Sequence, residues 1–162
     1  MKCRSLVAGF VLAVVAVAGQ CGLAEAGGSV PFSGWLQGDV TRTPTDPPPF
    51  VSVLVEGEGL ASHLGRFTID IPHLVNPVTR TAAGTYEFVA ANGDTLTAEF
   101  TGQSTPIEGT TFLWIKETAT IIGGTGRFTN ATGEFDAVRL FDTSDGTTCG
   151  WFDGVISRPR RR

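Results

Sequence analysis

The segment TYEFVAANGDTLTAEFTG, Thr85–Gly102, decides the fold. In its first half apolar and polar residues alternate, and the alternation returns after Asn92-Gly93. A period of two places successive side chains on opposite faces of a β-strand, and Asn-Gly is a strong signal for a tight turn between two strands. The segment therefore predicts a β-hairpin with one apolar face.

The same alternation recurs from Pro31 onward, in ranges 51–55, 65–71, 112–122 and 134–137, with turn residues between them. Phe152, Gly154 and Ile156 repeat the spacing of Phe32, Gly34 and Leu36, which suggests that the last strand pairs with the first and removes the exposed edges. We expect an all-β protein, a closed antiparallel β-barrel of about eight strands.

The N-terminus has the features of an export signal. Lys2 and Arg4 are followed by an apolar stretch, Leu6–Gly19, which is too short to favour a transmembrane helix. Small residues allow cleavage after Ala18 or after Ala26, and we favour Ala26. This divides the chain into a signal peptide (1–26), a barrel domain (27–157) and a basic C-terminal tail (158–162), in a protein that is secreted or resides in the periplasm or cell envelope.

The cleavage site decides the cysteine chemistry. Cleavage after Ala26 removes Cys3 and Cys21 and leaves Cys149 as a lone thiol, which is our expectation, whereas cleavage after Ala18 keeps Cys21 as a disulfide partner. Lipid anchoring at Cys21 is disfavoured because Gln20 precedes it.

The charge of the mature chain disfavours a nucleic-acid partner. Removal of residues 1–26 takes away two basic residues and one acidic residue, which leaves ten basic and fifteen acidic side chains and a formal charge of −5. The basic tail fits a solvated chain end better than a docking segment. The strands are short for an outer-membrane barrel and their outward faces carry Glu, Thr and Asp, so we do not expect the chain to span a membrane.

A glycine-rich segment carries a family resemblance. Gly123-Gly124-Thr125-Gly126-Arg127-Phe128, followed by Ala131-Thr132-Gly133-Glu134-Phe135, resembles the strand-turn-strand of the allene oxide cyclase and dirigent barrel superfamily. The resemblance implies an eight-stranded barrel around an apolar cavity, often oligomeric, in which reactive small molecules are steered. Its catalytic residues cannot be matched to positions of this chain. We interpret Gly123, Gly124, Thr125 and Gly126 as a structural turn and expect no phosphate site, because no helix is predicted after them.

Alternation also predicts which side chains face the barrel interior. An eight-stranded barrel is either filled by side chains or just wide enough for one small ligand, so these residues form a core or line a cavity. They are Phe67, Tyr86, Phe88, Leu96, Phe100 and Phe135.

Two residues are candidates for acid-base chemistry. Glu117 is the carboxylate that shares a face with Leu113, Ile115 and Ala119, and His63 lies at the start of an apolar strand, where a backbone partner is the more ordinary role. His63, His73 and Cys149 have no recognised metal-ligand spacing, so we expect neither a metal nor a cofactor.

Three functions remain open. The first is binding of a small apolar molecule in the barrel or at a mouth formed by the Pro-rich loop 43–49 and the loop 143–148. The second is an isomerase or cyclase like those of the resembled superfamily, and the third is a structural envelope or extracellular protein without a ligand. An enzyme is the less favoured reading, because it rests on analogy of fold.

Overall fold

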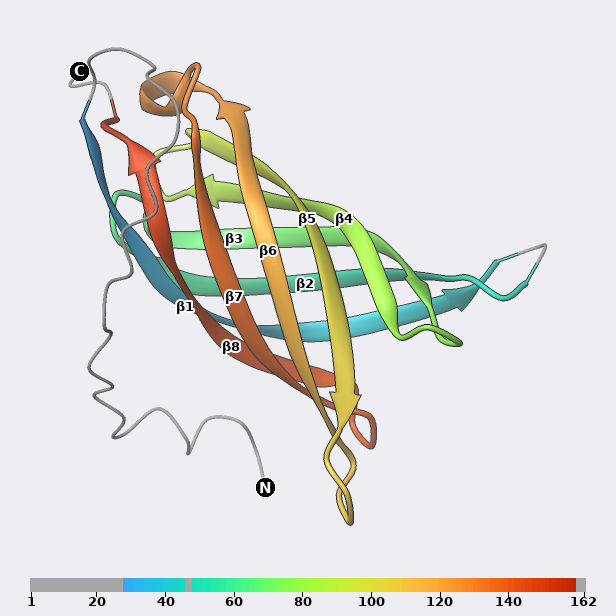
Figure 1. The fold of residues 1–162 in the computed structure, drawn as a ribbon. Helices are drawn as coiled ribbons and strands as arrows, with labels where there is room; N and C mark the ends of the chain where they lie inside the picture. Colours follow the sequence, from blue (N-terminus) through green and yellow to red (C-terminus); the bar gives the residue numbers. More distant parts are fainter. Residues whose placement is uncertain (1–27, 46–47, 160–162) are drawn as a thin grey trace.

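The computed structural model describes residues 28–45 and 48–159, and these residues form a closed barrel of eight antiparallel strands (Figure 1). Each strand pairs with its neighbours in sequence, and β8 pairs with β1 to close the sheet. The strands are β1 (Ser29–Pro44), β2 (Val51–Ala61), β3 (Gly65–Asn76), β4 (Thr81–Ala90), β5 (Thr95–Pro106), β6 (Phe112–Gly124), β7 (Gly133–Asp142) and β8 (Thr147–Ser157). The predicted fold class and the predicted pairing of the first and last strands are therefore confirmed.

The hairpin predicted from the opening segment is β4 and β5, with Tyr86 opposite Ala98 and Phe88 opposite Leu96. Its turn contains Gly93, whose φ of 82° lies in the left-handed region. The two strands turn one apolar face to the barrel interior, as the alternation requires.

The seam between β1 and β8 explains the similar sequences of the terminal strands. Phe32 lies opposite Gly154, and Gly34 lies opposite Phe152, so each inward ring faces a residue without a side chain. A Cβ on Gly34 would lie 2.8 Å from Cζ of Phe152 and 2.6 Å from Cβ of Ala61. The glycines therefore let two aromatic strands close the barrel without overfilling it.

One end of the barrel is filled by aromatic rings. Five phenylalanines make ring contacts with centroid separations of 5.1 to 6.4 Å, many of them edge-to-face, which is the favourable geometry for aromatic pairs. We call this the closed end; its ring cluster is Phe32, Phe67, Phe88, Phe135 and Phe152. All six residues expected inside lie buried in the barrel: Phe67, Tyr86, Phe88, Leu96, Phe100 and Phe135.

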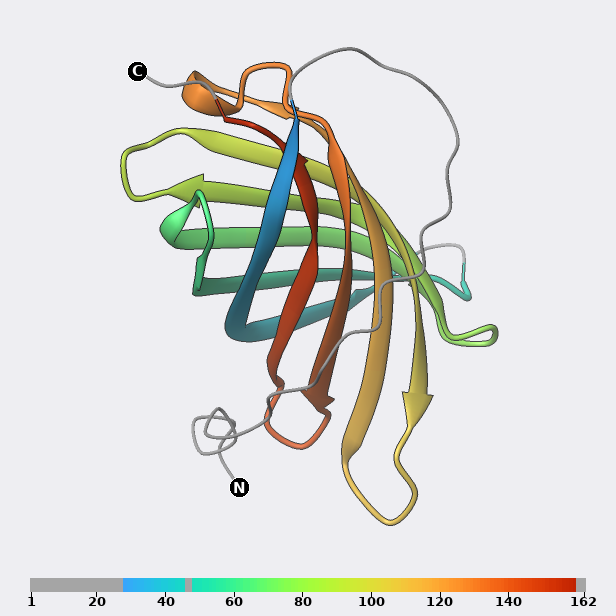
Figure 2. The same cartoon turned by 60° about the vertical axis from the view of Figure 1, so that its left-hand side comes forward.

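The glycine-rich turn joins β6 to β7 at the closed end (Figure 2). The pairing of β5 with β6 shifts register before Gly123, and β6 ends at Gly124. A short 3₁₀ helix, η2 (Gly126–Phe128), begins at the last of these glycines and buries Phe128. The expectation of no helix here is wrong in this detail. η2 is a single turn, and its Arg127 amide donates to the Asp94 carboxylate at 3.3 Å, so a side chain of the protein already takes the place of an anion.

Several sequence-based expectations concern residues outside the described ranges. The signal peptide, both cleavage sites, Cys3, Cys21 and the end of the basic tail lie there. Cys149 is disulfide-bonded, so the expectation of a lone thiol is wrong, and its partner lies outside the described residues. Within residues 28–45 and 48–159 no helix is long and apolar enough to cross a membrane.

Candidate functional site

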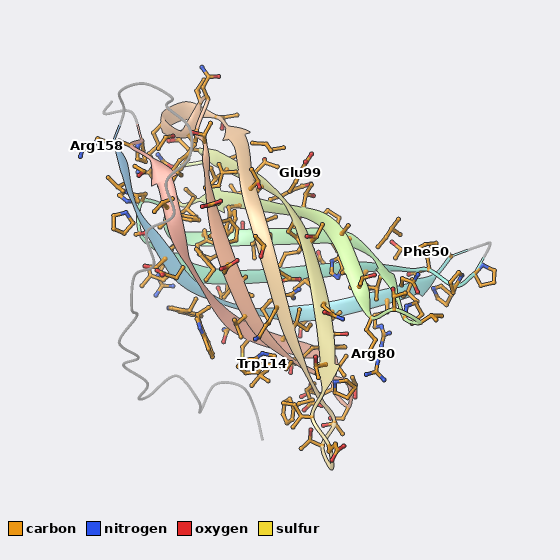
Figure 3. The ribbon with its side chains drawn as sticks, in the orientation of Figure 1. Phe50, Arg80, Glu99, Trp114 and Arg158 are labelled. Atoms are coloured by element: carbon orange, nitrogen blue, oxygen red, sulfur yellow. The ribbon has the colours of Figure 1, made fainter. Side chains whose placement is uncertain are left out.

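The other end of the barrel, which we call the open end, carries the candidate site. It is formed by the β1–β2, β3–β4, β5–β6 and β7–β8 connections. The predicted mouth loops 43–49 and 143–148 overlap two of these connections, but both are shorter than predicted: Thr43 and Pro44 are paired in β1, and 147–148 belong to β8. Figure 3 shows Phe50 and Arg80 at this end and Arg158 at the other.

A polar cluster lies inside the barrel between the aromatic rings and this opening. The Arg139 guanidinium donates from Nε to Oε2 of Glu117 at 2.9 Å and from Nη2 to Oε1 at 2.5 Å. The Tyr86 hydroxyl donates a short hydrogen bond to Oε2 of the same carboxylate. The two charged side chains are only 2% and 1% exposed. A bidentate ion pair and a buried hydroxyl therefore satisfy one another in a mostly apolar interior.

The cluster has one clear protonation state at neutral pH. Burial by itself would raise the pKa of Glu117, but the Arg139 charge and the hydrogen bonds from Arg139 and Tyr86 hold it below its ordinary value. Burial and the adjacent carboxylate raise the pKa of Tyr86 well above its ordinary value. Glu117 is therefore an ionised carboxylate whose two oxygens are engaged, and Tyr86 is a neutral donor. Because Glu117 is ionised, it has no proton to donate to a ligand.

His73 on β3 is the titratable group beside the cluster. Burial lowers the pKa of its imidazole, so the ring is neutral at pH 7. Its Nδ1 lies 2.8 Å from the Ile71 carbonyl oxygen, which can only accept, so Nδ1 carries the proton. The remaining nitrogen, Nε2, then has a lone pair, and it makes no hydrogen bond to the described residues.

A small pocket connects this cluster with the outside. It has a volume of about 70 Å³, and Glu117, Arg139 and His73 line it together with apolar side chains. Arg42 on β1 and Arg80 in the β3–β4 turn stand at its rim, both exposed. Most of its remaining lining is apolar: Val40, Val53, Val55, Val75, Ala82, Leu113, Ile115 and Phe141.

The two sequence candidates occupy opposite ends of the barrel. Glu117 faces the interior and lines the pocket. His63 is exposed in the turn between β2 and β3 at the closed end, where its Nε2 lies 3.1 Å from the Pro31 carbonyl oxygen. It therefore has the backbone partner expected of an ordinary turn histidine and takes no part in the site.

Sequence reasoning missed Arg139 and weighed His73 only as a metal ligand, although the alternation contained both. Phe135 and Ala137 place Arg139 on the inward face of β7, and Ile69 and Ile71 place His73 on the inward face of β3. Extending each pattern by two residues would have found them. Pairing of Arg139 with Glu117 needed the register of β6 with β7, which places Ala137 opposite Glu117.

The outer wall of the barrel also has a depression, of about 1020 Å³, over β3 to β7. It is larger than the interior pocket, but most of its lining side chains, such as Thr101, Lys116 and Thr118, point outward into solvent. We place the site in the interior pocket, because two buried and opposite charges, Glu117 and Arg139, converge on it. No group of three or more His, Cys, Asp and Glu in the described ranges could hold a metal ion.

Sequence comparison gives no relatives: no protein-family model matches the chain, and no curated protein matches it significantly. Comparison of structures finds proteins with a similar fold. The chain resembles the pterocarpan synthase dirigent protein GePTS1, with a TM-score of 0.55, 13% identity, and coverage of 82% of this chain and 92% of that one. It resembles the pterocarpan synthase dirigent protein PsPTS1 with a TM-score of 0.56, 13% identity, and coverage of 85% and 100%. At this identity the likeness concerns the fold, and it confirms at that level the resemblance seen in the glycine-rich turn: this chain folds as a dirigent-like β-barrel.

Proposed function

We propose that this barrel is an exported protein that binds a small molecule at its open end. One observation carries the proposal: Glu117 and Arg139, both almost fully buried, line a pocket that opens to the surface. A concave, mostly apolar site with a few convergent polar groups is the usual form of a small-molecule site.

Stability alone is a poor reason for such a cluster. Removing two charges from water costs several kcal/mol per ion, and apolar replacements of a buried ion pair are often as stable as the pair. A buried ion pair that faces a pocket is better explained by what it recognises there. The disulfide at Cys149 supports export, because disulfides persist in oxidising compartments.

The pocket sets the size of the ligand. At about 70 Å³ it is less than half of the roughly 150 Å³ of an engineered cavity that holds benzene. The proposed ligand is therefore either very small or inserts one short group and leaves its remainder at the mouth.

Ala82→Leu tests the proposal. Ala82 lines the pocket, and leucine adds three carbon atoms there while every charged side chain is kept. Ala83→Leu is the matched control, because Ala83 is the adjacent residue of β4 and is exposed on the outer wall. Native mass spectrometry of protein purified from its own export compartment should show an extra mass in the wild type and in Ala83→Leu that disappears on denaturation.

The same mass should be absent from Ala82→Leu. Retention of the ligand by Ala82→Leu would place binding elsewhere. A bare polypeptide in the wild type at every oligomeric state would contradict the proposal and favour a structural role.

A second candidate function is an isomerase or cyclase, and His73 is the observation that favours it. A neutral imidazole with a lone pair on Nε2, beside a fixed guanidinium, can take a proton from a bound substrate while Arg139 stabilises the developing negative charge. The fold shared with dirigent proteins that are pterocarpan synthases is consistent with this chemistry but does not identify a substrate.

Binding and turnover can be separated once the bound molecule is identified. In an enzyme, His73→Gln should still bind that molecule but accumulate it unconverted, whereas Glu87→Gln, on the outer face of β4, should behave as wild type. Equal conversion by His73→Gln and wild type would leave His73 without a catalytic role.

A further inference from the structure

We infer that the open-end pocket selects a small organic anion, such as a short-chain carboxylate, over its neutral counterpart. This inference rests on the proposed function and specifies its ligand. It follows from the charges that line the pocket, which are opposite in sign to the charge of the chain.

The pocket has an excess of positive charge. Its lining contains three arginines, Arg42, Arg80 and Arg139, and one carboxylate, Glu117. The chain as a whole has a formal charge of −4. Arg139 and Glu117 neutralise each other, and His73 is neutral at pH 7, so the two rim arginines supply the net charge that an entering ligand meets.

Those two arginines are available to a ligand. Neither Arg42 nor Arg80 forms an ion pair with any described residue. The Arg42 guanidinium lies 6.0 Å from the centre of the Phe141 ring, which is itself part of the pocket wall. Contact with a ring face orients a guanidinium and leaves its N–H groups free to donate in its plane.

The backbone holds Arg80 at the mouth. Its φ of 58° is unusual for a residue with a side chain, and its carbonyl oxygen accepts a hydrogen bond from the Ser104 amide at 2.9 Å. A non-glycine residue in the left-handed region costs free energy, and such strain persists where the surroundings fix it. The bond ties the β3–β4 turn to β5 and so keeps Arg80 at the rim.

The apolar walls of the pocket favour a ligand that carries an apolar group as well as a charge. Apolar side chains make up just over half of the lining, and its volume of about 70 Å³ accepts a group of only a few carbon atoms. A short alkyl chain in the pocket with its carboxylate between Arg42 and Arg80 satisfies both features, because planar guanidinium groups match carboxylate geometry.

NMR titration of the mature protein with butanoate and with butanamide tests the inference, because the two ligands have nearly the same shape and differ in charge. At low ionic strength we expect butanoate to bind about 10-fold more tightly, with chemical-shift changes centred on residues of the pocket. Raising the salt to 0.5 M should remove most of that difference, since exposed charges are then screened.

The double variant Arg42→Gln/Arg80→Gln should weaken butanoate binding about 10-fold, roughly 3-fold for each exposed arginine, and leave butanamide unchanged. Arg66→Gln/Arg158→Gln removes the same total charge from two exposed positions that do not line the pocket, and should change either affinity less than 2-fold.

The outcomes separate the two proposals. Equal binding of butanoate and butanamide, blocked by Ala82→Leu, would overturn the anion preference and leave the binding site in place. No binding of either ligand would count against both. Equal losses of butanoate affinity in the two double variants would show that net charge, and not the position of Arg42 and Arg80, causes the preference. Inorganic phosphate that binds as tightly as butanoate, even to Ala82→Leu, would show that the arginines attract bare anions only.

Discussion

Arg139→Met isolates the cost of the buried charge at the centre of the barrel. The substitution removes both hydrogen bonds from Arg139 to Glu117 and leaves the carboxylate 1% exposed with no opposite charge beside it. Breaking one side of a buried ion pair costs about 3–5 kcal/mol, which is a large share of the roughly 5–15 kcal/mol that stabilises a domain. Urea unfolding followed by circular dichroism should show this loss at pH 7 with an unchanged slope.

The triple variant Tyr86→Phe/Glu117→Met/Arg139→Met replaces the whole cluster by apolar groups of similar size. It should unfold within about 1 kcal/mol of the wild type, because no charge or hydroxyl is left buried without a partner. If the cluster serves recognition, this variant should keep its fold and lose its ligand.

The pH dependence gives a second check on Arg139→Met. Without the arginine, burial raises the pKa of Glu117 above its ordinary value of 4.5, so the folded state takes up a proton more readily than the unfolded state. The penalty should therefore be largest above that raised pKa and shrink as the pH falls toward 4. A loss below about 1 kcal/mol at pH 7 would contradict the cost assigned here to the unpaired carboxylate. A triple variant less stable than Arg139→Met would refute the reasoning that the pair is kept for recognition.

Three further predictions follow from single contacts. Burial lowers the pKa of folded His73 below 6.5, so at pH values below 6.5 the unfolded state binds more protons than the folded state. The free energy of unfolding should therefore fall as the pH drops from 7 toward 5. His73→Phe should make this pH dependence weaker, as measured by urea unfolding at each pH. Gly126→Ala should lower the free energy of unfolding by about 3 kcal/mol, because its φ is 56° and a Cβ would lie 1.9 Å from Oδ1 of Asp94. The control Gly109→Ala, with a φ of 73° and open space around it, should lower it by only about 1 kcal/mol in the same assay. Cleavage after Ala26 predicts a mature chain that begins at Gly27 and lacks Cys21; intact mass and disulfide mapping of the mature protein would contradict this if Cys21 is retained as the partner of the disulfide-bonded Cys149.

Local pattern was sufficient for the fold because strand periodicity is a local property. Alternation around Asn92-Gly93 predicted the β4–β5 hairpin, and the matched spacings of Phe32–Leu36 and Phe152–Ile156 predicted the closing seam. The same period placed Glu117 on the inward face of β6, where the structure has it. Each of these statements needs only the rule that successive residues of a strand face opposite sides.

The site depended on register and on distance along the barrel axis, which no local pattern encodes. Arg139 meets Glu117 because β6 and β7 pair in one register, and a shift by one residue would turn Arg139 outward. His63 and Glu117 were both candidates in sequence, with a backbone partner as the more ordinary role of His63. The structure separates them, because His63 lies in the β2–β3 turn at the closed end whereas Glu117 faces the open-end pocket. The sequence by itself determined which side chains face inward; only the tertiary structure decided which of them meet, because contacts between strands arise when the sheet closes.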